Sequence, residues 1–161
     1  MTDKKLKSHR VNIDKIDKEI YALIQKRASH AVAIGKIKSK VSPKESFYKP
    51  DRETKILRNI LNANKKGLLP DSKIRAIYKE LISGCLSLEE ILKVAYLGPE
   101  ATHSEAAVHN QFGSQALRIP TSTIDDVFYQ VINDDVNLGV VPVENSSEGV
   151  INTTLNLSLI H

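Results

Sequence analysis

Apolar residues in the first forty positions recur every three or four residues. This spacing is typical of a helix that packs along its whole length against another helix. Pro43 cannot continue a helix, so the pattern predicts one long helix from about Asp3 to Lys40. The apolar residues that form this stripe, here called the seam, are Leu6, Ile13, Ile16, Ile20, Leu23, Ile34, Ile37 and Val41.

Two shorter helices are predicted to follow. Pro50 suits a first helical turn, which indicates a helix from Asp51 to about Asn64, and a third helix is expected from Asp71 to about Lys93. The first helix would exceed about 50 Å, which these two helices are too short to cover. A second copy of the chain is the simplest cover, so we expect an intertwined helical homodimer.

After Lys93 the pattern changes to short apolar runs that alternate with helical stretches. Strands are expected at 93–97, 116–119 and 138–143, and helices at about 104–112, at 124–132 and after Gly149. This order predicts a parallel sheet with right-handed crossovers. The fold class is therefore an α plus α/β chain of two units, a three-helix all-α unit at 1–93 and an α/β unit at 94–161.

Charge divides the chain at the same place. Residues 1–93 carry 22 basic and 11 acidic side chains, whereas residues 94–161 carry one basic residue, Arg118, and eight acidic ones. Such a charge asymmetry indicates two units with different functions. No stretch of 18 apolar residues occurs, the N-terminal residues do not resemble a secretory signal, and Cys85 is the only cysteine. We expect a cytoplasmic protein without a disulfide framework or multi-cysteine metal site.

Basic residues interrupt the seam of the first helix. Arg27 occupies an apolar position, and Lys38 lies about 20° from it around the helix and about 16 Å along the axis, so both can lean into one gap. Arg10 lies about 25 Å from Arg27 and would reach only the partner's site in an antiparallel dimer. The alternatives are an arginine that extends to the helix edge and a solvated lysine.

Four further residues join this set. Arg52 and Glu53 open the second helix, where an ordinary charged first turn is the alternative. Cys85 and Glu89 are four residues apart on the expected third helix and share a face. A core thiol and a surface acid are the alternatives for this pair.

The stretches HRVNIDKIDKEIYALIQKRASHAVAIGKIKSK, YKPDRE and IYKELISGCLSLEE resemble the all-helical class of chorismate mutase. The resemblance implies a homodimer in which Arg27, with Arg10 from the partner, grips the two carboxylates of chorismate. It implies that Lys38 donates to the ether oxygen with Glu89 opposite, and that Arg52 and Glu53 hold the region of the ring hydroxyl. Cys85 stands where some members have Ser, Glu89 where others have Gln, and Lys49 where some have an acid.

The stretches VAYLGPEATHSEAAVHNQFG and GVVPVENSSEGVINTTLNL resemble the first lobe of prephenate dehydratase, a periplasmic-binding-like lobe. Its candidate ligand-binding residues, at expected helix starts, are Thr102, Ser104, Asn145 and Ser146, with plain N-capping as the alternative for Thr102 and Ser104. The Thr-Arg-Phe element of that family, which carries its reacting Thr, does not occur in these 161 residues. We therefore expect an incomplete dehydratase lobe, either a fragment of a longer fused enzyme or a truncated natural product.

Together these features predict a chorismate mutase of phenylalanine biosynthesis that needs no cofactor or metal. The full parent protein would also convert prephenate to phenylpyruvate. A carboxylate-binding module without turnover and a basic helical nucleic-acid binder are the alternatives. Against nucleic acid, aromatic residues amount to only 5% and the notable basic residues lie on an apolar seam. The expected partners are a small-molecule substrate and a second copy, with neither nucleic acid nor membrane.

Overall fold

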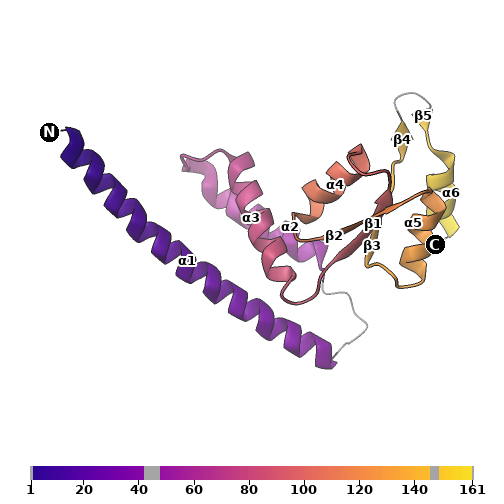
Figure 1. The fold of residues 1–161 in the computed structure, drawn as a ribbon, viewed down its shortest axis with the longest axis horizontal. Coiled ribbons are helices and arrows are strands. Elements are labelled where there is room, and N and C mark those ends of the chain that lie inside the picture. The colour runs from indigo at the N-terminus through magenta and orange to yellow at the C-terminus, as the bar shows by residue number, and fades with distance from the viewer. Residues whose placement is uncertain (1, 42–47, 146–148, 161) are drawn as a thin grey trace.

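The computed structural model describes residues 2–41, 48–145 and 149–160. Helices fill the first part: α1 (Thr2–Val41), α2 (Pro50–Ala63), the short 3-10 helix η1 (Asn64–Lys66) and α3 (Asp71–Leu86). The expected first and second helices are confirmed to within one or two residues at each end. We call residues 2–86 the helical region; in Figure 1, α1 is a single long rod whose N-terminal half extends away from all other elements.

The third helix ends earlier than its sequence pattern predicts. The structure ends α3 at Leu86 instead of near Lys93. The Ser87 hydroxyl donates to the carbonyl of Gly84 over 2.9 Å, and the Glu89 amide donates to the carbonyl of Leu86, which tightens the chain into a turn. Cys85 and Glu89 therefore do not share a helix face; Cys85 lies on α3 and Glu89 in the turn after it.

A small parallel sheet with helices forms the second part, here called the α/β region (residues 93–160). Its elements are β1 (Lys93–Leu97), α4 (His103–Phe112), β2 (Leu117–Thr121), α5 (Ile124–Ile132), β3 (Leu138–Val140), β4 (Glu144–Asn145), β5 (Gly149–Val150) and α6 (Asn152–Ile160). The strand order is β2-β1-β3, and both pairings with β1 are parallel, as predicted. The β4–β5 pair is a separate antiparallel ladder, which the sequence pattern does not predict.

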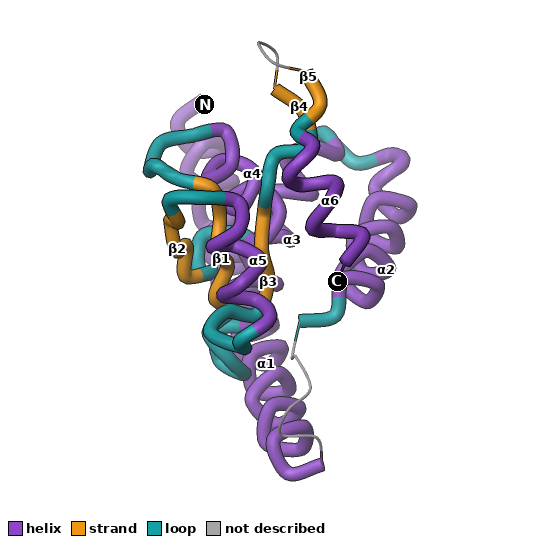
Figure 2. Tube along the Cα trace, turned by 90° about the vertical axis from the view of Figure 1, so that its right-hand side faces the viewer, coloured by secondary structure: helices purple, strands orange, loops and turns teal. Residues whose placement is uncertain are grey.

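The central strand β1 supplies the core of the α/β region. Val94 and Tyr96 face α4, where they pack with Val108, while Ala95 faces α5 and packs with Val127. These five side chains are almost completely buried. Helices thus cover both faces of the sheet, and Figure 2 shows α5 lying across β1. A sheet enclosed in this way reads as continuous apolar runs, the pattern seen at 94–97 and 138–143.

The helical region and the α/β region meet through α3 and the end of α4. Glu80 accepts hydrogen bonds from the Ser114 backbone nitrogen at 3.3 Å and from its hydroxyl at 2.6 Å. Gly113 lies so close to Ser83 that an added Cβ would come within 2.6 Å of the Ser83 Cβ. Its φ of 79° is also one that residues with a side chain rarely adopt. The glycine after α4 therefore permits this close approach.

Candidate active site

A cavity of about 290 Å³ lies among α1, α2 and α3. Its volume is at the lower end of the range for pockets that hold small organic ligands. Ala31, Ile34, Ile56, Ile82 and Leu86 form its apolar walls, and the charged side chains project among them. An apolar wall with a few convergent polar groups is the usual construction of a ligand site.

Six of the predicted site residues meet in this cavity. Arg27 and Lys38 come from α1, Arg52 and Glu53 from the first turn of α2, and Cys85 and Glu89 from α3 and the turn after it. His30 and Lys49 line it as well. Arg27 and Lys38 both line the cavity from α1.

Arg27 and Lys38 are held by α3 and its following turn. The Arg27 guanidinium donates to the carbonyl of Leu81 over 3.3 Å, and the Lys38 ammonium pairs with the Glu89 carboxylate at 3.4 Å. Gly35 lies between these two positions on α1 and touches the Glu89 backbone, where an added Cβ would lie 3.2 Å from its Cα. A side chain at this position would require Glu89 to shift by a few tenths of an ångström.

The charges of the cavity favour an anionic ligand. Four cationic side chains, Arg27, Lys38, Lys49 and Arg52, face it together with only two carboxylates, Glu53 and Glu89. Burial raises the pKa of Glu53, while Lys79 and a hydrogen bond with Tyr48 lower it in part. The excess of positive charge in a partly desolvated space attracts and orients an acidic compound.

Arg10 is the one catalytic candidate that this cavity does not contain. It lies on α1, 17 residues before Arg27, which corresponds to about 25 Å along the helix. Arg10 is exposed in the single chain, and the surrounding half of α1 contacts no other element in Figure 1. Arg10 therefore cannot reach the cavity of its own subunit, as its sequence position indicates, and its contribution to the partner's site stays a prediction.

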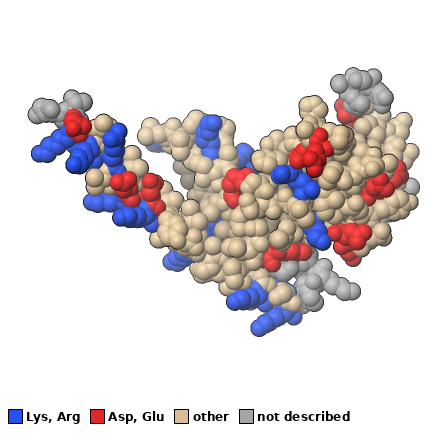
Figure 3. All heavy atoms as spheres, in the orientation of Figure 1, with Lys and Arg blue, Asp and Glu red and all other residues tan. Residues whose placement is uncertain are grey.

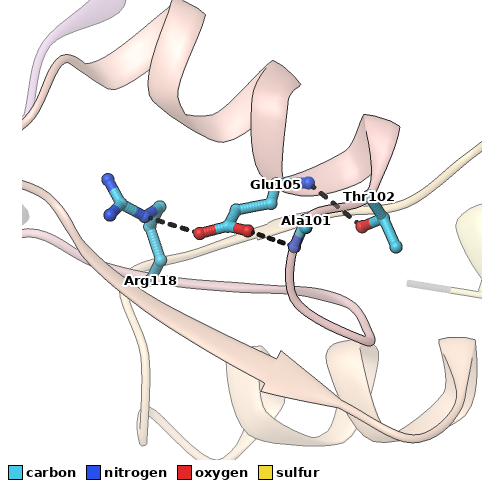
Figure 4. A network of polar contacts seen from close by, with 4 residues as sticks. All are labelled: Ala101, Thr102, Glu105 and Arg118. Carbon is cyan, nitrogen blue, oxygen red and sulfur yellow. Dashed lines mark hydrogen bonds and ion pairs between the residues drawn. The ribbon is translucent and has the colours of Figure 1, made fainter.

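The candidate ligand-binding residues Thr102 and Ser104 of the α/β region do not line this cavity. Thr102 is the N-cap of α4, where its hydroxyl accepts from the Glu105 amide over 3.5 Å, and Ser104 lies half-buried in the first turn. Glu105 also accepts from the Ala101 amide at 2.6 Å and pairs with Arg118 at 3.1 Å (Figure 4). Thr102 thus performs the N-capping that the sequence offers as its alternative role.

Two further candidates belong to the segment after β3. The backbone of Asn145 forms part of β4, while Ser146 lies outside the described residues. Sequence reasoning also missed Tyr48, whose hydroxyl bonds with Glu53 at the cavity. The only signal was its place two residues before the proline that begins α2.

Over residues 2–41, 48–145 and 149–160, no helix is both long and apolar enough to cross a membrane. The same residues contain no group of three His, Cys, Asp or Glu side chains placed to hold a metal ion.

Comparisons with known proteins divide the chain near residue 93, where the charge composition also changes. The family model of chorismate mutase type II matches residues 9–90, and that of prephenate dehydratase matches residues 94–160. A bifunctional chorismate mutase/prephenate dehydratase of Stutzerimonas stutzeri is 44% identical over 159 residues, covering 97% of this chain and 43% of that protein. Its counterpart of Aquifex aeolicus is 47% identical over 157 residues, covering 96% and 43%. That of Escherichia coli K12 is 25% identical over 164 residues, covering 92% and 42%. The chain therefore spans less than half the length of these relatives.

Proposed function

The chain belongs to the chorismate mutase type II family, and we propose that its helical unit rearranges chorismate to prephenate in phenylalanine biosynthesis. The observation that carries this proposal is the meeting of Arg27, Lys38 and Arg52 in one cavity with a surplus of positive charge. The rearrangement is intramolecular and needs no nucleophile, metal or redox cofactor. An enzyme accelerates it by holding a folded dianion and by stabilising charge that grows on the ether oxygen.

Each polar side chain then has a definite role. Arg27, with Arg10 of the partner subunit, holds the two carboxylates, and Lys38 donates to the ether oxygen with Glu89 opposite. Arg52 and Glu53 hold the ring hydroxyl, and Cys85, a buried thiol, stands beside the substrate as a weak donor. The distance of 3.4 Å between Lys38 and Glu89 supports a shared role at the ether oxygen, because both side chains reach the same end of the cavity.

The site is completed by a second copy of the chain. Every apolar seam residue of α1 is exposed in the single chain; the exposed fractions are 55% for Ile13, 66% for Leu23 and 62% for Ile37. An antiparallel copy of α1 covers this stripe and brings its Arg10 to the cavity. Basic side chains, with fewer acidic ones among them, lie along the N-terminal half of α1 (Figure 3), in keeping with attraction of an acidic substrate.

The α/β unit, residues 94–161, is proposed to be the first lobe of a prephenate dehydratase of the periplasmic-binding-like type. The family match over residues 94–160 and the parallel sheet support this role. Its carboxylate site would use Thr102, Ser104, Asn145 and Ser146. The whole protein would take chorismate through prephenate to phenylpyruvate in the cytoplasm, a location that one buried free cysteine supports.

A single assay tests the proposal. The purified 161-residue chain is incubated with chorismate in the presence of EDTA, and both chorismate and prephenate are quantified over time. We expect enzyme-dependent loss of chorismate and persistence of prephenate at neutral pH, with Arg27→Ala as the inactive control. Absence of conversion would refute the mutase assignment, whereas enzyme-dependent phenylpyruvate would refute the expected lack of dehydratase turnover in these residues.

A further inference from the structure

Glu53 has neighbours both inside and outside the cavity. It lies in the first turn of α2 and lines the cavity, and a hydrogen bond with Tyr48 lowers the pKa of its carboxyl. Tyr48 precedes Lys49 and Pro50, and Lys49 has extended backbone angles, as a residue before proline prefers. The chain direction at the start of α2 therefore brings the Tyr48 ring back toward Glu53.

Tyr48 is itself held by the α/β region. Its ring meets the ring of Phe112 edge to face, with centroids 5.4 Å apart and an interplanar angle of 70°. The Gln111 side-chain amide donates to the Tyr48 hydroxyl oxygen over 3.5 Å. Both partners stand in the last turn of α4, and they fix the ring by packing and the hydroxyl by a hydrogen bond.

The end of α4 is firmly attached to the helical region. The Lys79 ammonium of α3 donates to the carbonyl of Asn110, Glu80 binds Ser114, and Gly113 lies against Ser83. Lys79 also acts on Glu53, since its charge lowers the pKa of that carboxyl. Two paths thus run from the end of α4 to one carboxylate of the cavity.

We propose that Tyr48 is a positioning residue of the mutase site, through which Gln111 and Phe112 of the α/β unit orient the Glu53 carboxylate. The inference rests on the proposed mutase function for its consequence in turnover. The hydrogen bond from Gln111 polarises the Tyr48 hydroxyl, which makes this hydroxyl a stronger donor to Glu53. The three groups thus form one chain of hydrogen bonds. The α/β unit therefore contributes to the first reaction without touching its substrate.

Steady-state kinetics of the 161-residue chain test this role. Tyr48→Phe keeps the ring against Phe112 and removes only the hydroxyl. We expect KM for chorismate to rise about fivefold with kcat changed less than about twofold, because Glu53 holds the substrate alike in ground and transition states. Tyr129→Phe, which removes an exposed hydroxyl on α5, is the matched control and should leave both constants unchanged.

Double mutants separate a relay from general loosening of the fold. In the Glu53→Gln background, Tyr48→Phe should add nothing, and Gln111→Ala should add nothing to Tyr48→Phe, since all act through one path. Independent, multiplying effects of these substitutions would overturn the proposal, as would unchanged constants in Tyr48→Phe.

A second readout does not need turnover. The pKa of the Glu53 carboxyl, followed by carbon NMR with labelled glutamate, should rise in Tyr48→Phe and rise by less in Gln111→Ala. The other charged groups around Glu53, namely Lys49, Arg52, Arg58, Arg75 and Lys79, stay the same in these variants. An unmoved titration in Tyr48→Phe would overturn the relay even in an active mutase. A moved titration in a chain that fails to convert chorismate would refute the mutase function alone.

Discussion

The helical region and the α/β region bury their apolar residues in opposite ways. Val94, Ala95 and Val108 of the α/β region are fully buried, whereas Leu23 and Ile37 on the seam of α1 are each more than 60% exposed. The α/β region closes on itself because helices lie on both faces of one central strand. The helical region leaves its longest apolar stripe open, and this is the region that holds the cationic cavity.

The proposed substrate site depends on groups outside the helical region of a single chain. One chain forms the walls of the cavity among α1, α2 and α3. Arg10 of the partner subunit is proposed to bind the second carboxylate, and α4 holds Tyr48 in place. Because the core of the α/β region is complete within one chain, the substrate site can lie where the two regions and the two subunits meet.

Loss of either arginine should nearly abolish mutase turnover. Arg27→Ala and Arg10→Ala each remove a charged donor to the dianion, and we expect kcat/KM to fall by about a hundred- to a thousandfold. Steady-state kinetics with chorismate measure this, and Lys73→Ala, which removes an exposed cation of α3 outside the cavity, is the control. If Arg10→Ala retained normal kinetics, the partner subunit would not supply the second grip.

Mixing the two inactive variants sharpens that test. Random exchange makes half of the dimers mixed, and one site of each mixed dimer carries no lesion, so roughly a quarter of the sites should recover. Failure to recover, after exchange is verified by mass spectrometry, would mean that each site is built within one subunit.

A charge on the seam should separate the subunits. Ile20→Asp places a carboxylate in the proposed interface, which costs several kilocalories per mole when unpaired. We expect the variant to sediment as a monomer and to lose mutase turnover, while Ile20→Leu stays dimeric. A dimeric Ile20→Asp would show that the exposed seam has another cover.

A cavity in the α/β core should affect only that region. Val127→Ala removes two methyl groups beside Gly139 on the α5 face of the sheet, away from α4. The free energy of unfolding of the α/β region should fall by about 2 kcal/mol, measured by urea denaturation. Mutase kinetics and sedimentation should stay unchanged, and a loss of dimer in this variant would contradict the independence of the two cores.

Periodicity predicted the helices and the shared wall of Arg27 and Lys38 because both follow from a rise of 1.5 Å and a turn of 100° per residue. The early end of α3 escaped prediction, because the Ser87 hydroxyl competes for a helix carbonyl while the apolar spacing continues to Leu92. The contact of Tyr48 with Gln111 was also out of reach. It joins residues 63 apart through the packing of two units, and no local spacing records such a contact.

The smallest effect concerns two similar ion pairs, one at the cavity and one in the α/β region. Lys38–Glu89 at 3.4 Å lines the cavity, and Arg118–Glu105 at 3.1 Å lies in the α/β region. Charge grows on the ether oxygen during the rearrangement, so its neighbours must donate, and a glutamate donates only when protonated whereas glutamine donates at any pH. Wild-type kcat/KM should therefore be higher on the acidic side of neutrality than at alkaline pH.

Glu89→Gln should flatten this fall, Glu89→Ala should be poor throughout, and Glu105→Gln should keep the wild-type profile because its pair lies outside the cavity. The kcat/KM profile from pH 5 to pH 9 measures all four proteins. A flat wild-type profile, or the same falling limb in Glu89→Gln, would remove Glu89 from the ether oxygen. Both carboxylates have a cation within 4 Å, so the geometry of the pair does not distinguish them. Only the pair that faces a developing negative charge should carry the pH dependence of turnover.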